Sequence, residues 1–406
     1  MSLNDTPSAN RLHIGIFGRR NAGKSSFINR LTHSNVAIVS EVAGTTADPV
    51  YKSMEIHPIG PCVLIDTAGF DDEGELGSLR VAKTREAAEK TDIAILVTAA
   101  DQLSSVLNDP SALSFEKEWI DFFTGRKTPW LCVLNKTDLA GAGELEGCLR
   151  LLGTLAEKVY PLSSETGEGF PEFLQSLVEI PVDFEAPSLT AHLVRNGDSV
   201  LLVMPQDIQA PKGRLILPQV QVIRDLLDLG AIVTAVTAEK LPDALATLKN
   251  PPNLIITDSQ VFAKVYELKP PSTKITSFSV LLARYKGDIN AFVSGAAAIG
   301  RLTEADRVLI AEACSHNPLD GDIGREKIPA MLRKKIGPGL KIDVVSGNNF
   351  PEDLSPYSLI IHCGSCMFNR RHVLSRILRA EKAGVPITNY GVAIACLTGI
   401  LPNVEI

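Results

Sequence analysis

The stretch Gly18-Arg19-Arg20-Asn21-Ala22-Gly23-Lys24-Ser25 decides how the first part of this chain folds. It has the pattern G-x-x-x-x-G-K-S, with an apolar run, Leu12 to Phe17, before it and a helical pattern, Ser25 to Thr32, after it. In that setting the backbone N–H groups of the loop surround phosphate oxygens, the lysine contacts the terminal phosphates and the serine binds magnesium. The stretch therefore predicts a nucleoside triphosphate site. The predicted phosphate-binding residues are Gly18, Asn21, Ala22, Gly23, Lys24, Ser25 and Ser26.

Length and charge limit what else the chain can be. At about 100 to 200 residues per domain, the 406 residues predict two or three domains. A net charge of -7 argues against broad, charge-driven binding, so we expect neither nucleic acid nor a membrane as a partner. We find no signal-peptide pattern and no run long enough to span a bilayer, which predicts a cytoplasmic protein. In that reducing compartment the seven cysteines are expected to be buried, redox-active or metal-bound.

Two further segments have the features of a nucleotide-dependent switch. Val36 to Pro49 is predicted to be a loop, and its Thr45 and Thr46 stand where a switch places the threonine that senses the terminal phosphate through magnesium. A buried strand, Cys62 to Ile65, ends in Asp66-Thr67-Ala68-Gly69. From the end of a strand, the Asp66 carboxylate can hold magnesium through water and the Gly69 amide can contact the terminal phosphate.

Apolar strands alternate with amphipathic helices through the rest of this region. Strands are expected at Tyr51 to His57, as an exposed edge, and at Ile93 to Thr98, Trp130 to Leu134 and Val159 to Leu162; helices are expected at Leu79 to Lys90, Phe115 to Phe123 and Phe170 to Glu179. This alternation predicts an α/β fold with a doubly wound parallel sheet.

The base is indicated by Asn135-Lys136-Thr137-Asp138, which follows one of these strands. A carboxylate at Asp138 can accept hydrogen bonds from both N1–H and the exocyclic amine of guanine, and adenine offers neither donor on that edge. Asn135 and Lys136 complete this motif, and Ser163-Ser164-Glu165 follows a later strand, where a backbone amide can reach the guanine carbonyl. The nucleotide predicted for this site is therefore GTP with Mg²⁺.

These motifs, in this order, resemble the TrmE-Era class of GTPases over residues 12–179. The resemblance implies that Asn21 coordinates a potassium ion beside the phosphates, and that hydrolysis is slow and assisted by K⁺ and by pairing of two GTPase domains. Phe70 stands where Ras-like enzymes carry the glutamine that orients the attacking water, and an apolar side chain cannot do that. The carboxylates of Asp71-Asp72-Glu73 could position water instead, or could form a solvated loop.

The middle of the chain repeats the α/β pattern without a triphosphate motif. A linker is expected around Pro181 and Pro187, and Pro270-Pro271 is predicted to mark a second boundary. The predicted domains are thus residues 1–180, 186–268 and 272–406. A small apolar α/β unit that lacks a site is often an association module, so we expect residues 186–268 to dimerise the chain, the alternative being a spacer.

The last third contains cysteines at two predicted strand ends. The strand Val308 to Ala311 leads to Cys314-Ser315-His316, and the strand Leu359 to Ile361 leads directly to His362-Cys363-Gly364-Ser365-Cys366. Ligands of open α/β sheets gather at the carboxyl ends of strands, and thiolates are soft ligands that suit zinc or an iron-sulfur cluster. The other four cysteines lie singly in apolar runs and are predicted to fill cores: Cys62, Cys132, Cys148 and Cys396.

Spacing alone leaves the metal open. Three cysteines with His316 or His362 would make a closed structural zinc site. The same residues would make a 4Fe-4S cluster in which one iron lacks a thiolate, because such clusters normally take four cysteines. That iron could carry a histidine, water or an incoming metal fragment.

The cysteine pattern behind a GTPase domain resembles the HydF family, the maturation GTPases of iron-iron hydrogenases, over essentially the entire chain. The resemblance implies a 4Fe-4S cluster on Cys314, Cys363 and Cys366, with His316 and His362 as candidates for the fourth ligand. It also implies a scaffold that receives a diiron precursor built with the radical enzymes HydE and HydG and passes it to the hydrogenase HydA. GTP would order or release the loops 36–49 and 66–80 and so change partner contacts.

Arg370 and Arg371 follow the last motif cysteine closely. A diiron fragment that carries cyanides is anionic, so these guanidinium groups could guide it, unless they only begin a solvated helix. Two rival functions remain at this stage. One is a GTP-dependent RNA or ribosome assembly factor with a structural zinc domain, and the other is a GTPase signalling module with redox-sensing cysteines.

Overall fold

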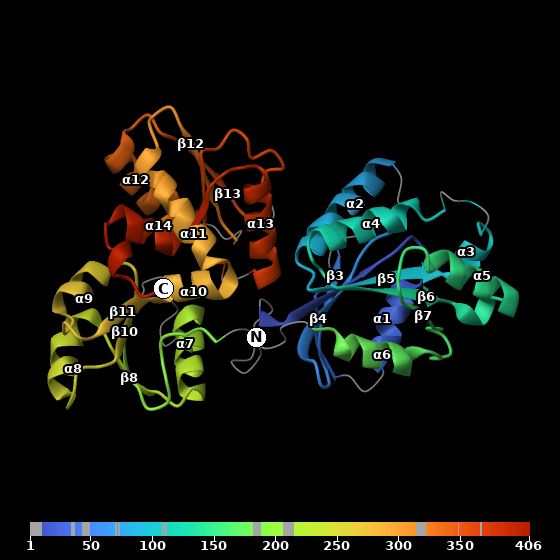
Figure 1. Ribbon diagram of the computed structural model, residues 1–406, viewed down its shortest axis with the longest axis horizontal. Helices are drawn as coiled ribbons and strands as arrows, with labels where there is room; N and C mark the ends of the chain where they lie inside the picture. The colour runs from blue at the N-terminus through green and yellow to red at the C-terminus, as the bar shows by residue number, and fades with distance from the viewer. Residues whose placement is uncertain are drawn as a thin grey trace. The chain divides into compact units, whose positions relative to one another are not determined.

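The computed structural model describes residues 10–33, 37–42, 49–69, 71, 74–107, 109, 112–181, 188–205, 215–313, 322–347, 349–365 and 368–406. The chain divides into two compact units, residues 1–185 and 186–406, which Figure 1 draws in the colours of the chain order. Among the described residues, no helix is both long and apolar enough to cross a bilayer.

The described strands of the first unit form a seven-stranded sheet in the order β2-β3-β4-β1-β5-β6-β7. The strands are β1 (Leu12–Phe17), β2 (Ala37–Val42), β3 (Val50–Ile56), β4 (Gly60–Asp66), β5 (Ile93–Ala99), β6 (Trp130–Asn135) and β7 (Val159–Pro161). The helices are α1 (Lys24–His33), α2 (Gly74–Glu89), α3 (Ala100–Ser104), α4 (Ser114–Gly125), α5 (Ala142–Leu152) and α6 (Phe170–Glu179), with a 3₁₀ turn, η2 (Thr137–Leu139).

This sheet confirms the α/β prediction and corrects it at one side. Strands β4, β1, β5, β6 and β7 pair in parallel, whereas β3 pairs antiparallel with both β4 and β2. The segment predicted as a loop, residues 36–49, contains β2, and the predicted edge strand Tyr51 to His57 is instead internal. The run Ala37-Ile38-Val39 is rich in β-branched residues, and it satisfies the free edge of β3.

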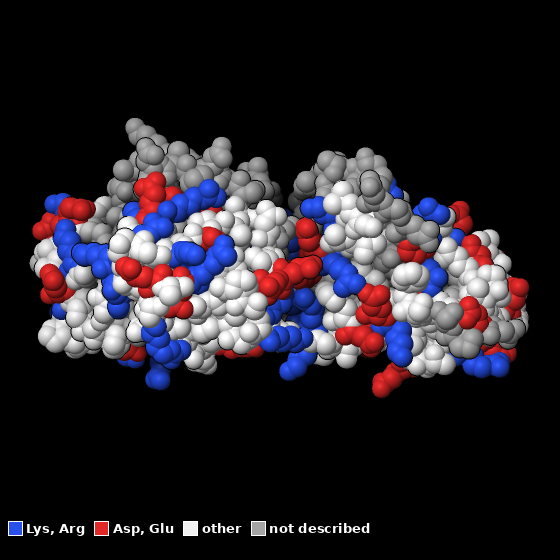
Figure 2. Space-filling view, turned by 90° about the horizontal axis from the view of Figure 1, so that it is seen from above, with Lys and Arg blue, Asp and Glu red and all other residues white. Residues whose placement is uncertain are grey.

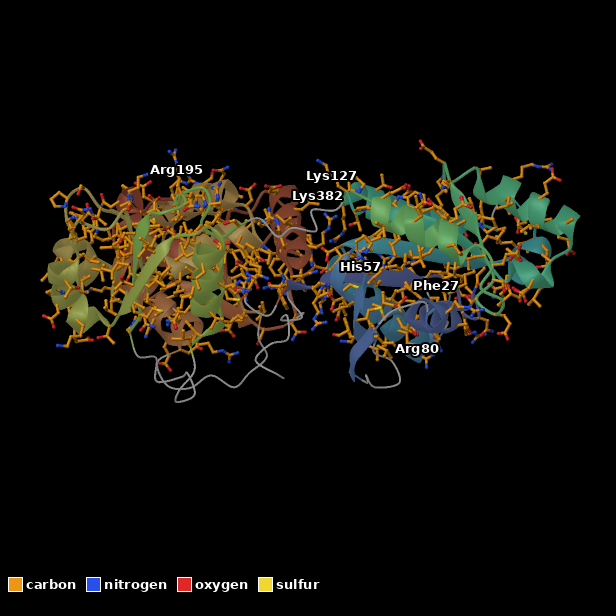
Figure 3. The ribbon with its side chains drawn as sticks, turned by 90° about the horizontal axis from the view of Figure 1, so that it is seen from below. Phe27, His57, Arg80, Lys127, Arg195 and Lys382 are labelled. Carbon is orange, nitrogen blue, oxygen red and sulfur yellow. The ribbon has the colours of Figure 1, made fainter. Side chains whose placement is uncertain are left out.

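Helices cover both faces of this sheet, as a doubly wound fold requires. On one face α1 and α6 bury Phe27, which Figure 3 labels. Its ring centroid lies 5.3 Å from that of Phe170 and 5.2 Å from that of Phe173. On the other face the aromatic residues of α4 pack on Phe17 of β1. Alternate residues of each central strand therefore point to opposite cores, which explains their nearly continuous apolar sequences.

The second unit contains two four-stranded parallel sheets, with strand orders β11-β10-β8-β9 and β13-β12-β14-β15 among the described residues. The strands are β8 (Ser199–Val203), β9 (Ile232–Val236), β10 (Leu254–Thr257), β11 (Lys274–Ser277), β12 (Arg307–Ala311), β13 (Lys341–Val345), β14 (Leu359–His362) and β15 (Ile387–Asn389). The helices are α7 (Leu217–Asp228), α8 (Leu241–Thr247), α9 (Phe262–Leu268), α10 (Phe278–Lys286), α11 (Ile289–Ala296), α12 (Ile328–Ile336), α13 (Arg370–Lys382) and α14 (Tyr390–Leu397), and a π-helical turn, η5, spans Ile323–Lys327.

The boundary predicted at Pro270-Pro271 would separate the last strand of the first of these sheets from the other three. These prolines lie between α9 and β11, and β11 pairs with β10 in parallel. The sheet therefore continues to Ser277, beyond the predicted limit of residue 268. A continuous apolar core then joins both sheets, because Leu201 of β8 and Ile310 of β12 belong to the same cluster of buried side chains.

Register in the last sheet aligns the carboxyl ends of its strands. Ala311, the last residue of β12, pairs with Val345 of β13 and with His362 of β14, and His362 pairs with Asn389 of β15. Whatever follows each strand therefore starts from one edge of the sheet.

Three of the four cysteines predicted to fill cores are fully buried: Cys62, Cys132 and Cys148. Burial raises the pKa of the Cys62 and Cys132 thiols to about 12, so both stay protonated and unreactive at neutral pH. Cys396 is half-buried at the margin of the second unit's core, where its thiol donates to the carbonyl of Ala296.

Candidate functional site

The phosphate loop connects β1 to α1 and packs tightly on the neighbouring strand ends. Asn21 and Gly23 have left-handed φ angles of 62° and 88°. A Cβ atom at Gly23 would collide with the Asn135 side chain, and one at Gly18 would collide with the carbonyl of Val97. Glycine is therefore required at both positions by close approach as well as by φ.

Lys24, Ser25 and Asp66 meet beside this loop. The Lys24 Nζ donates to the carbonyls of Gly18 and Arg19, at 2.9 and 2.7 Å, and the Ser25 Oγ donates to Asp66 Oδ2 at 2.7 Å. Burial raises the pKa of Asp66, and the hydrogen bond from Ser25 opposes this rise. The structure thus brings together the ammonium group predicted for phosphate and two of the oxygen ligands predicted for magnesium.

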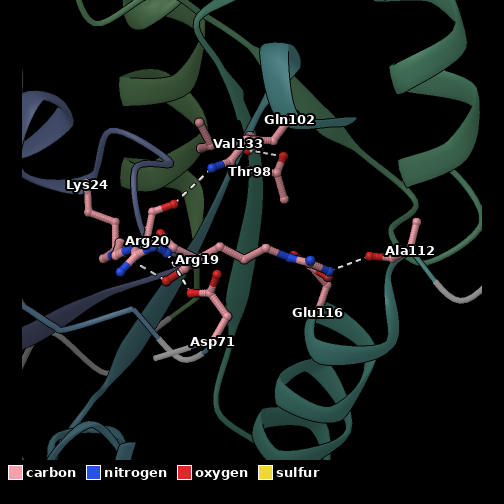
Figure 4. A network of polar contacts seen from close by, with 10 residues as sticks. Arg19, Arg20, Lys24, Asp71, Thr98, Gln102, Ala112, Glu116 and Val133 are labelled. Carbon is pink, nitrogen blue, oxygen red and sulfur yellow. Dashed lines mark hydrogen bonds and ion pairs between the residues drawn. The ribbon is translucent and has the colours of Figure 1, made fainter. Parts of the chain in front are cut away.

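An ion pair between a half-buried arginine and a buried glutamate anchors the loop, and the sequence did not reveal it. Arg19 Nε and Nη2 each lie 2.7 Å from a Glu116 carboxylate oxygen, and Nη2 also donates to the carbonyl of Ala112 (Figure 4). Glu116 is 1% exposed, and its hydrogen bond raises the pKa of Arg19. Arg19 occupies a position where the motif accepts any residue, so no sequence signal marked it.

The backbone of Arg20 is held from two sides. Its N–H donates to Asp71 Oδ1 at 2.7 Å, and its carbonyl accepts from Gln102 Nε2 at 2.8 Å (Figure 4). Asp71 therefore contacts the phosphate loop, whereas the sequence analysis left it either to position water or to lie in a solvated loop. The other predicted switch residues, Thr45, Thr46, Phe70, Asp72 and Glu73, lie outside the described residues.

Asn135 joins three of the predicted motifs. Its Nδ2 donates to the Ala22 carbonyl at 3.1 Å, and its Oδ1 accepts from the Ser164 amide at 3.0 Å and from the Ser164 hydroxyl at 2.9 Å. With 1% exposure, Asn135 acts as a structural bridge between the phosphate loop and the segment predicted to contact guanine. The spacing of motifs indicated their proximity but not this arrangement.

The remaining base-site residues lie around that bridge. Lys136 has a left-handed φ of 59°, and its Nζ contacts Asp101 Oδ2 at 2.8 Å. Asp138, in η2, is exposed. Ser163 is fully buried, and its hydroxyl accepts from the Thr166 amide at 3.1 Å, which shapes the turn that presents Ser164.

The second site lies at the aligned strand ends of the last sheet. The Cys363 Sγ accepts a hydrogen bond from the Ala313 amide at 2.9 Å and another from the Ser365 amide at 3.4 Å. The Cys363 amide in turn donates to the Ala311 carbonyl at 2.9 Å. Ala313 and Ser365, the described residues that precede Cys314 and Cys366 in the sequence, both contact Cys363 in this way. Amide donors of this kind stabilise a thiolate.

His362 is fully buried beneath this loop. Arg376 Nη1 donates to its Nε2 at 2.9 Å, and its Nδ1 lies 2.9 Å from the Ser365 Oγ and 3.0 Å from the Cys363 carbonyl. Burial, followed by the charge of Arg376, lowers the pKa of His362 to about 3, so the ring is neutral with its proton on Nδ1. Both nitrogens are engaged, and His362 supports the loop rather than offering a lone pair to a metal.

Two further predictions meet the structure here. Arg370 Nη1 donates to the carbonyls of Arg284, Tyr285 and Gly287 at the end of α10. This contact corrects the suggestion that Arg370 guides an anionic fragment, because its guanidinium instead caps that helix. Cys314, His316 and Cys366 lie outside the described residues. Within the described ranges, which omit 314–321 and 366–367, no group of three His, Cys, Asp or Glu side chains could hold a metal ion.

Comparison with known proteins places the first unit. The family model of the 50S ribosome-binding GTPase matches residues 13–136. The tRNA modification GTPase MnmE of Endomicrobium trichonymphae is 35% identical over 42% of this chain and 35% of that protein, and GTPase Der of Wolinella succinogenes is 44% identical over 23% and 20%. The chain spans about a third or less of the length of these relatives. The crystal structure of Aquifex aeolicus Era bound to GDP and AlF4- aligns with a TM-score of 0.32 at 18% identity, over 58% of this chain and 98% of that one.

The phosphate loop, the family model and the sequence relatives define the class: the chain contains a GTPase domain, of the kind that binds GTP with magnesium and hydrolyses it. The hydrogen maturase F dimerization domain matches residues 189–287, and the hydrogen maturase F tetramerization domain matches residues 290–404. Together they cover more than half of the chain, which therefore belongs to the hydrogen maturase F family. The resemblance predicted from the motifs is confirmed, and both domain descriptions indicate that the chain associates with its own copies.

Replacing Asp138 by asparagine tests the guanine assignment. The change removes a charged acceptor for two guanine N–H groups, and hydrogen bonds to charged groups contribute about 1.5–3 kcal/mol. We expect GTP affinity to fall about 10- to 100-fold, and xanthosine triphosphate, which has a carbonyl in place of the amine, to bind better than GTP. Equilibrium titration with both nucleotides measures this. The neighbouring exposed Leu139, replaced by alanine, is the control, and unchanged selectivity in Asp138→Asn would contradict the assignment.

Proposed function

We propose that this GTPase is a cytoplasmic scaffold that holds a 4Fe-4S cluster through Cys314, Cys363 and Cys366 and leaves one iron open. In this proposal the scaffold receives the diiron precursor of the iron-iron hydrogenase site from the radical enzymes HydE and HydG and transfers it to HydA. The family assignment supports the maturation context. The observation that carries the cluster assignment is the Cys363 sulfur, which accepts two backbone N–H groups at the edge where the strand before Cys314 also ends.

The described residues fit such a cluster. Cys363 is only partly buried, unlike the cysteines of the first unit's core. Amide donors at 2.9 and 3.4 Å favour the thiolate, the form that binds iron. Beneath it the Arg376 guanidinium is buried between Phe350 and Phe368, 4.8 Å from each ring centroid. This fixed cation favours an anionic cluster at the adjoining edge.

GTP is proposed to act as a switch on partner contacts. The Arg20 amide, a phosphate-loop donor, donates to Asp71, which lies within the predicted switch segment 66–80. A terminal phosphate would compete for that amide and release Asp71. Ordering or release of residues 66–80 would then change the surface offered to a partner.

Self-association is proposed to use the exposed edge of the sheet formed by β8 to β11. In the described residues β9 pairs only with β8, and Ile232 on β9 is 63% exposed. Val220 and Leu227 on α7, which packs beside β9, are 48% and 57% exposed. An unpaired apolar edge of this kind is a template for pairing with a second copy of the strand.

Replacing Cys363 by serine tests the cluster proposal. Anaerobically purified or reconstituted wild-type protein should contain about four irons per chain and give an electron paramagnetic resonance signal on reduction. Cys363→Ser should lose or alter that signal and fail to activate apo-hydrogenase. The control is Cys396→Ser, which changes a half-buried cysteine of the same unit.

Three outcomes of this metal analysis separate the rival functions. Iron and sulfide in the wild type support the scaffold. Colourless protein with stoichiometric zinc would support the assembly factor. An RNA-binding surface would need a broad basic area. On the face shown in Figure 2, acidic and basic residues lie side by side in each unit instead. Metal-free protein with reversibly oxidised thiols would support the redox-sensing module.

Replacing Asn21 by alanine tests the potassium proposal. Asn21 is exposed on the phosphate loop with its left-handed φ, so its side-chain carbonyl can reach an ion beside the phosphates. We expect wild-type GTP hydrolysis to be several-fold faster in KCl than in NaCl at equal ionic strength, and Asn21→Ala to lose this difference. Equal rates in the two salts for the wild type would refute the proposal. Because alanine disfavours positive φ, Asn21→Gly is the control for backbone strain.

Replacing Ile232 by lysine tests the dimer surface. A buried isoleucine contributes about 1.5–3 kcal/mol, and a lysine placed opposite its own copy adds repulsion, so the dimer should dissociate at least about tenfold more readily. Sedimentation velocity of the full-length chain over a concentration series measures this. Leu268→Lys, at an exposed apolar position on α9, is the control. Equal dissociation in both variants would exclude the β9 edge as the interface.

A further inference from the structure

Tyr390 is the first residue of α14 and directly follows β15. Because β15 pairs with β14 in parallel, Tyr390 starts from the same sheet edge as Cys363 and as the segment that leads to Cys314. Three neighbouring strands thus deliver a phenol and two cysteine segments to one place. The sequence analysis did not single out this tyrosine, because no motif contains it.

The Tyr390 hydroxyl is buried and has no hydrogen-bond partner among the described residues. A buried polar group without a partner costs about 1–3 kcal/mol, and such groups in a native protein call for an explanation. The phenol lies against the backbone of Gly324 and near Glu312 Oε1. The other oxygen, Glu312 Oε2, accepts from the Arg325 guanidinium at 3.0 Å.

Gly324 makes room for this arrangement. A Cβ atom at residue 324 would collide with the Tyr390 hydroxyl and would lie 2.8 Å from Glu312 Oε1. The Asp322 carboxylate accepts from the Gly324 amide at 2.8 Å and from the Arg325 amide at 2.9 Å, which holds the turn η5 in place. The hydroxyl therefore lies in a cradle formed by the Gly324 backbone and the Glu312 side chain.

The surroundings give the hydroxyl the character of a donor. Burial, followed by the nearby Cys363 and Glu312, raises the pKa of Tyr390, so the phenol stays protonated. Asp322 acts in the same direction and Arg325 opposes it. Cys363 and Tyr390 follow the paired strand-end residues His362 and Asn389. A protonated phenol at this edge can gain most by donating to an electron-rich acceptor.

We propose that the Tyr390 hydroxyl donates a hydrogen bond to a sulfur of the iron-sulfur centre held by Cys363, either the thiolate or a sulfide. This inference rests on the proposed cluster site and adds a residue that tunes it. Hydrogen bonds to cluster sulfurs withdraw electron density and raise the reduction potential. Tyr390 is thus a positioning and tuning residue that acts from outside the ligand set.

The variant Tyr390→Phe tests this, with Tyr357→Phe as the matched control. Tyr357 precedes β14, at the opposite edge of the same sheet, and its hydroxyl donates to Asp343 Oδ2 at 3.0 Å. We expect Tyr390→Phe to bind iron and to show about a tenfold lower ratio of reduced to oxidised cluster at a fixed potential, equivalent to about 59 mV for one electron. Tyr357→Phe should match the wild type in a redox titration followed by electron paramagnetic resonance.

The unfolding of cluster-free protein separates tuning from a structural role. Tyr390→Phe removes a hydroxyl that has no hydrogen-bond partner among the described residues, so the thermal midpoint of the cluster-free variant should equal or exceed that of the wild type. Tyr357→Phe loses a hydrogen bond, so its midpoint should fall. A lower midpoint for cluster-free Tyr390→Phe would overturn the proposal, because the hydroxyl would then have a partner within the protein.

A second variant keeps the hydroxyl but displaces it. In Gly324→Ala the added methyl group should push the phenol out of the cradle and lower the reduction potential as Tyr390→Phe does. If wild-type protein binds a cluster and neither variant shifts its reduction potential, the hydrogen bond from Tyr390 is absent. The inference is then wrong, and the proposed cluster function stands. If wild-type protein binds no iron after reconstitution, the proposed cluster function fails, and this inference fails with it.

Discussion

Parallel strand pairing is the constraint on which both sites depend. Parallel neighbours bring their carboxyl ends to one edge, so residues far apart in the chain become adjacent without any contact of their own. In the first unit this rule places the ends of β1 and β4 together, so that the Ser25 hydroxyl reaches Asp66. In the second unit it aligns Ala311, His362 and Asn389, and the segments that follow them converge on Cys363.

Buried polar bridges then turn these edges into defined sites. Asn135 connects the phosphate loop to the turn at Ser164, and Arg19 connects the same loop to Glu116 of α4. Such buried groups are costly to separate, because each would leave a partner unsatisfied in the interior. They hold the loop in a shape suited to phosphate, one through the Arg19 side chain of the loop and the other through the backbone carbonyl of Ala22.

The edge of the last sheet concentrates polar groups in an otherwise apolar unit. Burial and the charge of Arg376 lower the pKa of His362 and keep it neutral, Arg325 pairs with Glu312, and backbone amides donate to Cys363. Each of these contacts is satisfied within the protein, whereas the Tyr390 hydroxyl is not, among the residues that the structure describes. This difference is informative because a folded core rarely leaves a donor unused, and this donor belongs to the residue that follows Asn389, the strand-end partner of His362.

The sequence by itself determined the nucleotide class, the strand and helix alternation and the two cysteine segments, because glycine-rich loops, guanine-binding carboxylates and soft ligands depend on residue type and local spacing. It did not determine that residues 37–42 extend the sheet, that the strand after Pro270-Pro271 belongs to the same sheet as those before it, or that Arg370 caps α10. Nor did it show the Arg19–Glu116 pair, the neutral His362 or the Tyr390 hydroxyl, which has no hydrogen-bond partner in the described part of the chain. These features join residues that are distant in the chain, and only packing and strand register decide which distant polar groups meet, because residue type alone does not encode a partner.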